Sequence, residues 1–285
     1  MNFNTKELRA KAFDYLFDAV VVTDMDGRIT DWNKGSEVLY GYTKEEVIGQ
    51  LVSMLHVPED SAAVTSEVLS AVKSGGKWSG EIRMLHKDGH IGWIESMCVP
   101  FHAKNGEMEG ALGINRDITQ RVREAERLQH RAHYDHLTDI PNRYLLLDRL
   151  KHLIEQSKRN NRTFALFFID LNKFKLINDT KGHAFGDQIL IEVANILKVK
   201  IRSSDTVARF GGDEFIMLLE DVHSKEDALK MMETLSAELD TECIINGEKL
   251  KISSSIGVAL YPDEGSTIEQ LISAADKAMY KIKTK

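Results

Sequence analysis

The sequence of 285 residues predicts two α+β domains that are joined by a helix. In the first half, short runs with strand character alternate with turns that contain glycine, which is typical of an antiparallel sheet. From residue 118 to residue 134, apolar side chains recur every three or four positions, and this spacing predicts a helix with one apolar stripe. In the second half, apolar runs alternate with helical patterns, so we expect a sheet with helices packed against its faces.

Composition limits the class of protein before any motif is considered. A hydrophobic fraction of 42% in 285 residues fits two globular domains, each with its own core. The net charge of −7 argues against broad binding of nucleic acid through its phosphates, but it allows a mononucleotide bound together with a metal ion. Cys98 and Cys243 lie far apart in the sequence, so we expect reduced thiols rather than a disulfide or a zinc site.

Long apolar segments are absent from the sequence. No ten consecutive residues are all apolar, and the N-terminus lacks a long apolar core. We therefore expect no transmembrane segment, no signal peptide and no membrane partner, and we place the protein in the cytoplasm.

The first domain is expected to begin with a helix over residues 5–16. Short helices are then indicated near residues 36–39 and 44–47. The runs with strand character, separated by turns that contain glycine, are residues 19–24, 29–32, 78–85, 90–100 and 111–116.

This order of elements resembles a PAS domain. Further signals are Tyr-Gly-Tyr at residues 40–42 and His-Val-Pro-Glu-Asp at residues 56–60. The resemblance covers about residues 8–119 and implies five antiparallel strands with helices. We assign residues 1–117 to a PAS sensory domain with an N-terminal cap helix.

The resemblance implies that the first domain senses a haem, a flavin, a metabolite or a partner's surface. His56 is a candidate axial ligand of haem, but PAS domains often carry a histidine in this loop, so we favour a structural role. Cys98 lies in a strand pattern without the helical Asn-Cys-Arg motif of light-sensing flavin domains, so no cysteinyl flavin adduct is expected. His86 and His90 flank a turn and could meet across a hairpin; we expect them to be solvated. The PAS ligand stays open between haem, flavin and none.

Residues 118–134 are predicted to form a signalling linker helix. Its apolar positions are Ile118, Val122, Ala125, Leu128 and Ala132. So narrow a stripe suits pairing with a second copy of itself, and an ordinary solvated helix is the alternative. We favour a parallel coiled coil in a homodimer, because the reaction considered below needs two catalytic domains to meet.

The second half contains two adjacent carboxylates between runs with strand character. Asp213 and Glu214 follow Gly211 and Gly212, and a Gly-Gly pair indicates a hairpin because both residues can take positive φ. Carboxylate oxygens at the tip could hold a divalent cation such as Mg2+. The alternative is an acidic, solvated hairpin tip. An apolar run before Asp170 indicates a buried strand that places this third carboxylate at its end.

The motifs around these carboxylates resemble those of the GGDEF family of diguanylate cyclases. The matching segments are residues 170–179, Gly182-His183, Gly186-Asp187 and the Gly-Gly-Asp-Glu-Phe at 211–215. The resemblance extends from Asp135 to the C-terminus and implies the family's palm-like α+β fold, so we assign residues 135–285 to this domain. Helices are expected at 144–156 and 186–200, and a later strand at 250–261.

The opening of this domain, residues 135–143, resembles the family's Asp-x-Leu-Thr-Gly-Leu-Pro-Asn-Arg. Asp139 replaces the usual glycine, and we expect this departure to affect the local turn and none of the ligands proposed for the site.

The resemblance implies a reaction in which two GTP molecules condense into cyclic di-GMP and two pyrophosphates. Each 3′-hydroxyl attacks the α-phosphorus of the other nucleotide, a transfer that depends on positioning and charge neutralisation. Asp170, Glu214 and the Leu171 carbonyl are then expected to bind Mg2+ or Mn2+. Asp213 is either a second metal ligand or assists deprotonation of the attacking hydroxyl, so Asp213 and Glu214 are the expected catalytic pair.

The same resemblance implies where the substrate binds. Asn178 and Asp187 would read the guanine edge, and the Asp187 carboxylate suits its N1 and N2 donors. Lys175 and Lys283 would contact phosphates. The complete expected substrate set is Phe174, Lys175, Asn178, Asp187, Gly211, Gly212 and Lys283.

Arg202 and Asp205 have the spacing of the family's inhibitory Arg-x-x-Asp site, with five residues between Asp205 and Gly211. A guanidinium can bind a guanine Hoogsteen edge or a phosphate, and the carboxylate can accept from the base. The resemblance therefore implies product inhibition by cyclic di-GMP. The alternative is a surface ion pair of little energetic consequence.

The C-terminal residues depart from the family pattern. The chain ends at Lys285, whereas the family usually continues through Gly-Arg-Asn, whose arginine contacts phosphate. This departure leaves open whether the sequence is a piece of a longer protein, such as one with a following phosphodiesterase domain. The alternative function is a catalytically weak or degenerate GGDEF domain that binds GTP or cyclic di-GMP as a regulatory module.

Overall fold

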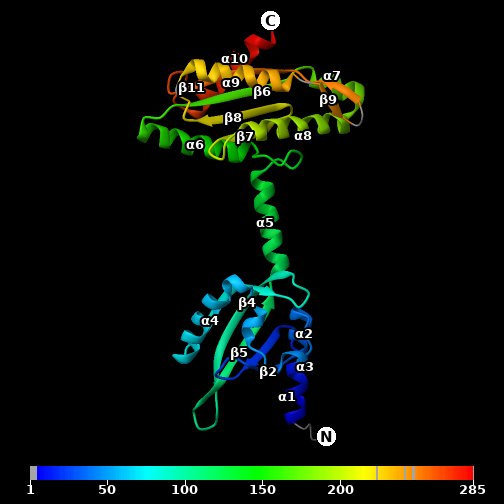
Figure 1. The fold of residues 1–285 in the computed structure, drawn as a ribbon, viewed down its shortest axis with the longest axis vertical. Coiled ribbons are helices and arrows are strands. Elements are labelled where there is room, and N and C mark those ends of the chain that lie inside the picture. Colours follow the sequence, from blue (N-terminus) through cyan, green and yellow to red (C-terminus); the bar gives the residue numbers. More distant parts are fainter. Residues whose placement is uncertain (1–4, 223, 241, 246–247, 285) are drawn as a thin grey trace. The chain divides into compact units, whose positions relative to one another are not determined.

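The structure is a computed structural model that describes residues 5–222, 224–240, 242–245 and 248–284. The chain divides into two compact units, Met1–Arg127 and Leu128–Lys285, each with its own sheet. Figure 1 shows the two units and the helix between them.

The first unit is built on an antiparallel sheet that has five strands among the described residues, in the order β2-β1-β5-β4-β3. The strands are β1 (Ala19–Thr23), β2 (Ile29–Trp32), β3 (Trp78–Leu85), β4 (Ile91–His102) and β5 (Met108–Asp117). This confirms the five predicted antiparallel strands. The last strand, β5, stands in the middle of the sheet because it returns to pair with β1 as well as with β4.

Short helices pack around this sheet. They are α1 (Thr5–Asp14), α2 (Lys34–Tyr40), α3 (Lys44–Val47), the 3-10 helix η1 (Val52–Leu55) and α4 (Pro58–Lys73). Helix α4 was not predicted, because Val72 is its single fully buried residue and no clear apolar stripe marks it. Its start did carry a signal, since Pro58 stands at the first helical position and two acids follow in the first turn.

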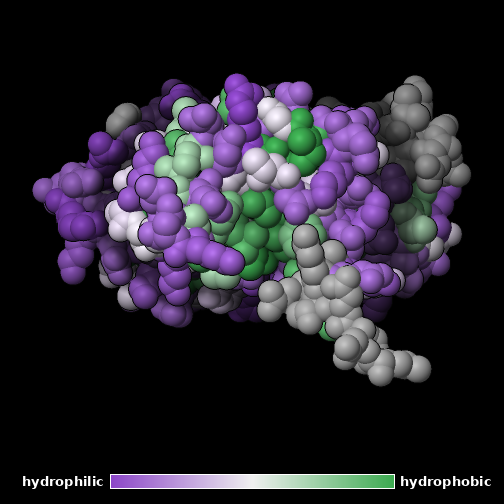
Figure 2. Space-filling view, turned by 90° about the horizontal axis from the view of Figure 1, so that it is seen from below, coloured by the Kyte–Doolittle hydropathy of each residue, from purple (hydrophilic) through white to green (hydrophobic). Residues whose placement is uncertain are grey.

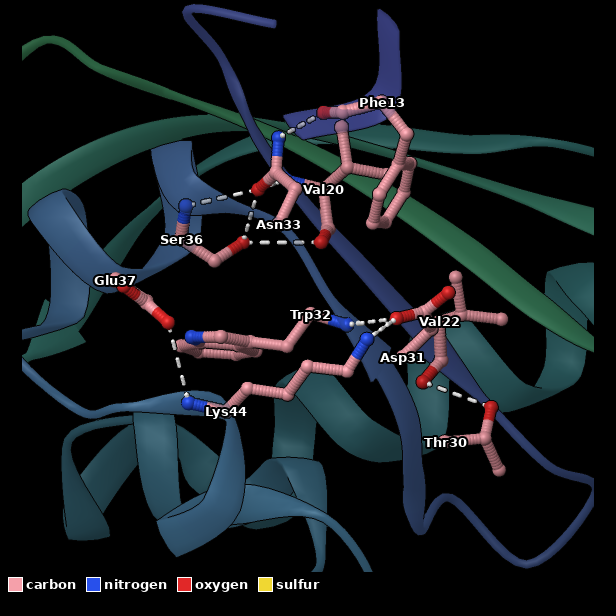
Figure 3. A network of polar contacts seen from close by, with 10 residues as sticks. All are labelled: Phe13, Val20, Val22, Thr30, Asp31, Trp32, Asn33, Ser36, Glu37 and Lys44. Carbon is pink, nitrogen blue, oxygen red and sulfur yellow. Dashed lines mark hydrogen bonds and ion pairs between the residues drawn. The ribbon is translucent and has the colours of Figure 1, made fainter. Parts of the chain in front are cut away.

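Buried Asn33 ties the start of β1 to the start of α2 (Figure 3). Its side-chain oxygen accepts from the backbone N–H of Val20 at 2.8 Å and from both the N–H and the hydroxyl of Ser36 at 2.9 Å. Its amide nitrogen donates to the carbonyls of Phe13 at 3.2 Å and Asp18 at 3.0 Å. All polar atoms of this buried side chain are therefore hydrogen bonded, which offsets the cost of removing them from water.

Helix α5 (Thr119–His133) follows β5 directly and confirms the predicted linker helix. All of its residues are described, and none of them is buried. The side chain of Leu128, in the predicted apolar stripe, is 66% exposed. The part of the stripe that lies in α5 is therefore free to pair, whereas Ile118, its first residue, is buried; the coiled coil itself stays a prediction.

The second unit contains an antiparallel sheet with the order β11-β6-β8-β7 among its described residues. Its strands are β6 (Phe164–Leu171), β7 (Thr206–Gly211), β8 (Glu214–Glu220) and β11 (Ser254–Tyr261). A small second sheet pairs β9 (Glu242–Ile245) with β10 (Glu248–Lys251). The single strand predicted over residues 250–261 is wrong, because the chain leaves β10 at Lys251 and enters β11 at Ser254.

Helices cover both faces of the larger sheet (Figure 1). They are α6 (Arg143–Asn160), α7 (Phe174–Lys181), α8 (His183–Lys200), α9 (Lys225–Leu239) and α10 (Ile268–Lys283). Every residue of β6 is buried, as predicted, because its side chains alternate between the two covered faces. Phe167 packs with residues of α8 and α9, whereas Phe168 packs with residues of α6 and α10.

Gly257 in β11 allows α10 to lie close to the sheet. A Cβ at this position would lie 2.1 Å from the carbonyl oxygen of Ala275 and 2.2 Å from the backbone nitrogen of Met279. A side chain here would push the helix away from β11. The glycine thereby fixes the course of α10, whose last residue is Lys283.

The face of the molecule in Figure 2 is mostly hydrophilic, with hydrophobic residues gathered near its centre. None of the helices in the described part of the chain is both long and apolar enough to cross a membrane. Cys98 is a free thiol that is partly buried, as expected, whereas the side chain of Cys243 lies outside the described residues.

Candidate active site

Three carboxylates meet where β6 ends and β8 begins. Asp170 in β6 lies directly opposite Glu214 in β8, and residues that face each other in this way project from the same side of the sheet. Asp213 precedes Glu214, and its carbonyl accepts from the backbone N–H of Leu171 at 3.3 Å. The predicted strand thus delivers a buried Asp170, only 8% exposed, to the two acids of the hairpin.

The hairpin turn lies one residue later than the glycine pair suggested. Gly211 is the last residue of β7 and pairs with Glu214, so the two residues between the strands are Gly212 and Asp213. Gly212 has a φ of +50°, which favours glycine, but Gly211 does not take a positive φ. The expectation of two central glycines is therefore wrong, and Glu214 is the first residue of a strand rather than a free tip.

Arg209 stabilises this turn through hydrogen bonds, a role that the sequence analysis did not predict. Its guanidinium donates two hydrogen bonds to the carbonyl of Gly212, at 3.0 and 2.8 Å, and a third to Asp135 Oδ1 at 3.0 Å. Asp135 also accepts from the backbone and the hydroxyl of Thr138. Burial raises the pKa of Asp135, but the hydrogen bonds from Thr138 and Arg209 outweigh it and leave that pKa lowered. The opening segment of the unit thereby braces the carboxylate turn.

Negative charge accumulates at the site. Burial, followed by the nearby Asp170 carboxylate, raises the pKa of Asp213. Burial and the carboxylates of Asp170 and Asp213 raise the pKa of Glu214. Burial and the neighbouring carboxylates both disfavour the ionised forms of Asp213 and Glu214, so a cation among these groups would be stabilised.

Besides Arg209, Lys283 brings a positive charge to this place. Its Nζ lies 2.5 Å from Asp170 Oδ1, and it lowers the pKa of both Asp213 and Glu214. The lysine reaches the site because α10 lies close to β11 over Gly257.

The residues present fit a divalent metal ion. The donor set consists of carboxylate oxygens of Asp170 and Glu214, the neighbouring Leu171 carbonyl and the Asp213 carboxylate, all of them hard ligands. Burial, together with the neighbouring carboxylates, raises the pKa values of Asp213 and Glu214, and a doubly charged ion would offset both effects.

A second polar feature lies between α7 and α8. Asn178 Oδ1 is buried and has no hydrogen-bond partner among the described residues. A Cβ on residue 186 would lie 1.9 Å from that oxygen, so Gly186 is required for Asn178 to sit where it does. Asp187 follows Gly186 and is exposed. An unpaired buried acceptor is costly, and a ligand that donates to it would remove that cost.

The other expected substrate residues lie around these two features. Phe174 is buried at the start of α7, and a Cβ on residue 186 would lie 3.1 Å from its ring. Lys175 is exposed in the same helix, and Gly211 and Gly212 are exposed at the turn.

Two family profiles match the chain. The profile described as "Diguanylate cyclase, GGDEF domain" matches residues 132–285, more than half of the chain. The chain belongs to the GGDEF family. The profile described as "PAS fold" matches residues 29–115, so a PAS domain precedes the GGDEF domain, as the sequence indicated.

Curated relatives resemble one or both domains. The bifunctional diguanylate cyclase/cyclic di-GMP phosphodiesterase MucR of Pseudomonas aeruginosa is 45% identical over 152 residues, which cover 53% of this chain and 22% of that protein. The probable diguanylate cyclase DgcE of Escherichia coli is 31% identical over 283 residues, which cover 99% of this chain and 26% of that protein. The chain therefore spans about a quarter of the length of these curated relatives.

Solved structures show the same fold for the GGDEF domain. The GGDEF domain of TpbB from Pseudomonas aeruginosa is 38% identical with a TM-score of 0.52, and the match covers 53% of this chain and 89% of that one. The coiled coil and GGDEF domain of DgcB from Caulobacter crescentus, solved in complex with c-di-GMP, is 27% identical with a TM-score of 0.53. That match covers 58% of this chain and 88% of the other.

Asp139, which replaces the glycine usual in the family, still adopts the left-handed conformation in the opening turn of the GGDEF domain. Asp139 has a φ of +53°, a left-handed conformation that costs a residue with a Cβ about 1 kcal/mol or more relative to glycine. Its carboxylate lies 3.2 Å from His130 Nε2 in α5, and its carbonyl accepts from Lys198 Nζ at 3.0 Å. These contacts hold the residue in place and tie it to the end of the linker helix.

Arg202 and Asp205 meet through the backbone of the turn before β7. Asp205 Oδ2 accepts from the Arg202 backbone N–H at 2.9 Å, and Oδ1 accepts from the Glu220 backbone N–H at 3.1 Å. The carboxylate therefore joins the start of β7 to the end of β8, a structural role that the sequence did not reveal. The Arg202 side chain is exposed.

The PAS domain encloses a mostly apolar cavity of about 210 Å³ that His56 helps to line. His56 Nδ1 is buried without a partner among the described residues, and burial lowers the pKa of this histidine. Pockets for drug-sized ligands occupy about 300–1,000 Å³. The cavity is smaller than that range, and the PAS ligand, open between haem, flavin and none, stays a prediction.

Proposed function

We propose that the protein is a PAS-regulated diguanylate cyclase that condenses two GTP molecules into cyclic di-GMP and two pyrophosphates. The observation that carries this proposal is the cross-strand pair of Asp170 and Glu214 with Asp213 in the adjoining turn. The raised pKa values of Asp213 and Glu214 indicate a centre that is prepared for positive charge. Family membership supports the same reaction.

The chain's own residues supply positions for the metal and the nucleotide. Asp170, Glu214 and the Leu171 carbonyl would hold Mg2+ or Mn2+, which when bound neutralises the triphosphate and polarises the α-phosphate. Asp213 either adds a further ligand or accepts the proton of the attacking 3′-hydroxyl, and a raised pKa brings a carboxylate closer to the value that suits a base.

Guanine recognition is assigned to the space beside α7 and α8. The unpaired Asn178 Oδ1 accepts from an N–H of the base, and the exposed Asp187 carboxylate accepts from the remaining donors on the same edge. Lys175 and Lys283 neutralise phosphate charge. Lys283, which is bonded to Asp170, already stands beside the carboxylates that would face the triphosphate.

The reaction requires two copies of the chain. One domain offers one base site and one set of carboxylates, so it presents a single GTP for reaction. We propose a homodimer in which the exposed stripe of α5 pairs with its copy and turns the two GGDEF domains toward each other. The sensed signal would act by changing the rotation of this pair.

The test is incubation of the chain with GTP and Mg2+, followed by chromatography of the nucleotides. Cyclic di-GMP is expected from the wild type and is expected to disappear in Glu214→Gln, which removes a charge but no core volume. Glu220→Gln, at the opposite end of the same strand, is the matched control and should keep the rate. GTP binding without turnover in the wild type would instead establish the regulatory module as the function.

A further inference from the structure

The turn between β3 and β4 in the PAS domain brings three metal-ligating side chains to one point. Asp88 Oδ1 lies 2.9 Å from His86 Nδ1 and 2.6 Å from His90 Nδ1. The two imidazole rings stack with their centroids 4.3 Å apart. The histidines therefore meet across the hairpin, the possibility that the sequence left open, while His90 remains exposed to solvent as expected.

Backbone contacts hold these groups in place. The His86 N–H donates to the His90 carbonyl at 3.0 Å, and the His90 N–H donates to Asp88 Oδ1 at 3.0 Å. Gly89 has a φ of +91°, which lets the chain reverse within the turn. The His86 ring also packs against Gly41, where a Cβ would lie 2.5 Å from ring atoms. The ligand groups are thus positioned before any ion binds.

We propose that His86, Asp88 and His90 bind a divalent transition-metal ion, with Zn2+ as the representative of its class. Two imidazole nitrogens and one carboxylate oxygen are donors of zinc, nickel and copper sites. The three ligand atoms lie within 4.8 Å of one another. Tetrahedral zinc with bonds of about 2.0 Å needs ligand atoms about 3.3 Å apart, a change that side-chain rotation can supply. Water would complete the coordination.

The charge of the turn favours a cation. Asp88 Oδ1 accepts the His90 backbone N–H at 3.0 Å, a hydrogen bond that favours the charged form of the carboxylate. Neutral imidazoles add two lone pairs beside this negative charge. The site differs in donor type from the carboxylates of the GGDEF domain, because Mg2+ prefers oxygen ligands and gains little from imidazole.

The turn is joined to the start of the linker helix through β4. The Trp93 N–H donates to Thr119 Oγ1 at 2.8 Å, and the Trp93 carbonyl accepts from the Ile118 N–H at 2.9 Å. His86 and His90 also line a hollow to which Glu124 of α5 contributes. An ion in the turn would restrain the hairpin that holds the first turn of α5.

The test is calorimetric titration of the untagged chain with zinc chloride in excess Mg2+, which occupies the carboxylate centre. We expect one Zn2+ per chain. In His90→Gln the affinity for Zn2+ should fall by roughly tenfold to a hundredfold or more, because even the loss of a residue that hydrogen-bonds to a metal ligand costs that much. The His90 side chain is half exposed, so this variant keeps its core. Ni2+ should compete for the same site and Ca2+ should not.

His152→Gln is the matched control. His152 Nδ1 lies 3.7 Å from the carboxylate of Asp148, and this pair includes no second histidine that could complete a metal site. This variant should bind Zn2+ as the wild type does. Equal affinity in the wild type and His90→Gln would overturn the site, and so would the absence of binding in the wild type. Either result would leave two histidines that simply share hydrogen bonds with Asp88.

Discussion

The side chain of Asn178 occupies the space that a side chain on Gly186 would need. A Cβ there would lie 1.9 Å from Asn178 Oδ1. This oxygen is buried and has no hydrogen-bond partner among the described residues. The glycine therefore serves the proposed guanine site by leaving room for its acceptor.

We predict that Gly186→Ala raises the KM for GTP by roughly tenfold, the equivalent of one hydrogen bond to the base. Stability should change little, because alanine in a helix gains about 1 kcal/mol over glycine and offsets the displacement of Asn178. Steady-state kinetics and thermal unfolding measure the two quantities. In an Asn178→Ala background, the substitution at 186 should have no further effect on KM. Additive effects in this cycle would contradict the steric account.

The carboxylate centre should make the protein less stable at neutral pH than it would be without Glu214. A carboxyl whose pKa is raised on folding contributes stability below its usual value of 4.5 and loses it as pH rises through the folded value. Without divalent metal, Glu214→Gln should therefore have a higher Tm than the wild type at neutral pH, and the difference should vanish below about pH 4.5.

Added Mg2+ should raise the Tm of the wild type more than that of the Glu214→Gln variant, because the ion relieves the same repulsion. Glu233→Gln, an exposed substitution in α9, is the control and should follow the wild type at every pH. A lower Tm for Glu214→Gln in the absence of metal would show that Glu214 stabilises the fold and does not strain it.

Product inhibition should depend on the guanidinium of Arg202. Because that side chain is exposed and Asp205 is engaged by the backbone, Arg202→Ala should lower cyclic di-GMP affinity with little change in initial rate. Asp205→Asn would be a poor test, since it also disturbs the turn. Titration calorimetry with cyclic di-GMP measures the effect, with exposed Arg159→Ala as the control. Equal product affinity in wild type and Arg202→Ala would remove this residue from the inhibitory site.

The hydrogen bonds of Asn33 should be a main determinant of PAS stability (Figure 3). Asn33→Ala leaves the buried Val20 N–H without its partner and removes one hydrogen bond each from the Ser36 N–H and the Asp18 carbonyl, and we expect a loss of about 3 kcal/mol. All three tryptophans of the chain, at 32, 78 and 93, lie in this unit, so tryptophan fluorescence during denaturation reports on it alone. Asn105→Ala, in an exposed turn, should cost far less. Similar losses would show that the network carries little net energy.

Activity should depend periodically on the length of α5. Each inserted residue turns a helix by about 100°, so one alanine after Leu128 should misalign the two GGDEF domains and lower the rate. An insertion of roughly seven residues, one heptad, should restore the register and much of the rate. Light scattering must show that both variants are dimers. Equal rates would mean that the linker is a passive tether and that regulation takes another route.

Local patterns in the sequence determined the PAS strands, the linker helix and the strand that ends near Asp170. The apolar run before Asp170 predicted a strand buried on both faces, and alternation with turns predicted the PAS sheet. Asp213 and Glu214 lie where the hairpin enters β8, and Asp170 lies near the end of the neighbouring strand β6. Such features depend on neighbours within a few residues, so periodicity and turn chemistry reveal them.

Contacts between distant segments were decided by the tertiary structure alone. Arg209 meets Asp135 across 74 positions. Lys283 meets Asp170 across 113 positions, and Gly257 leaves room for the close approach of α10 to β11 that brings them together. The stacking of His86 on His90 likewise depends on the exact closure of one turn and on packing against Gly41. Side-chain convergence of this kind follows from how helices and strands pack, and the order of residues along the chain does not encode it locally.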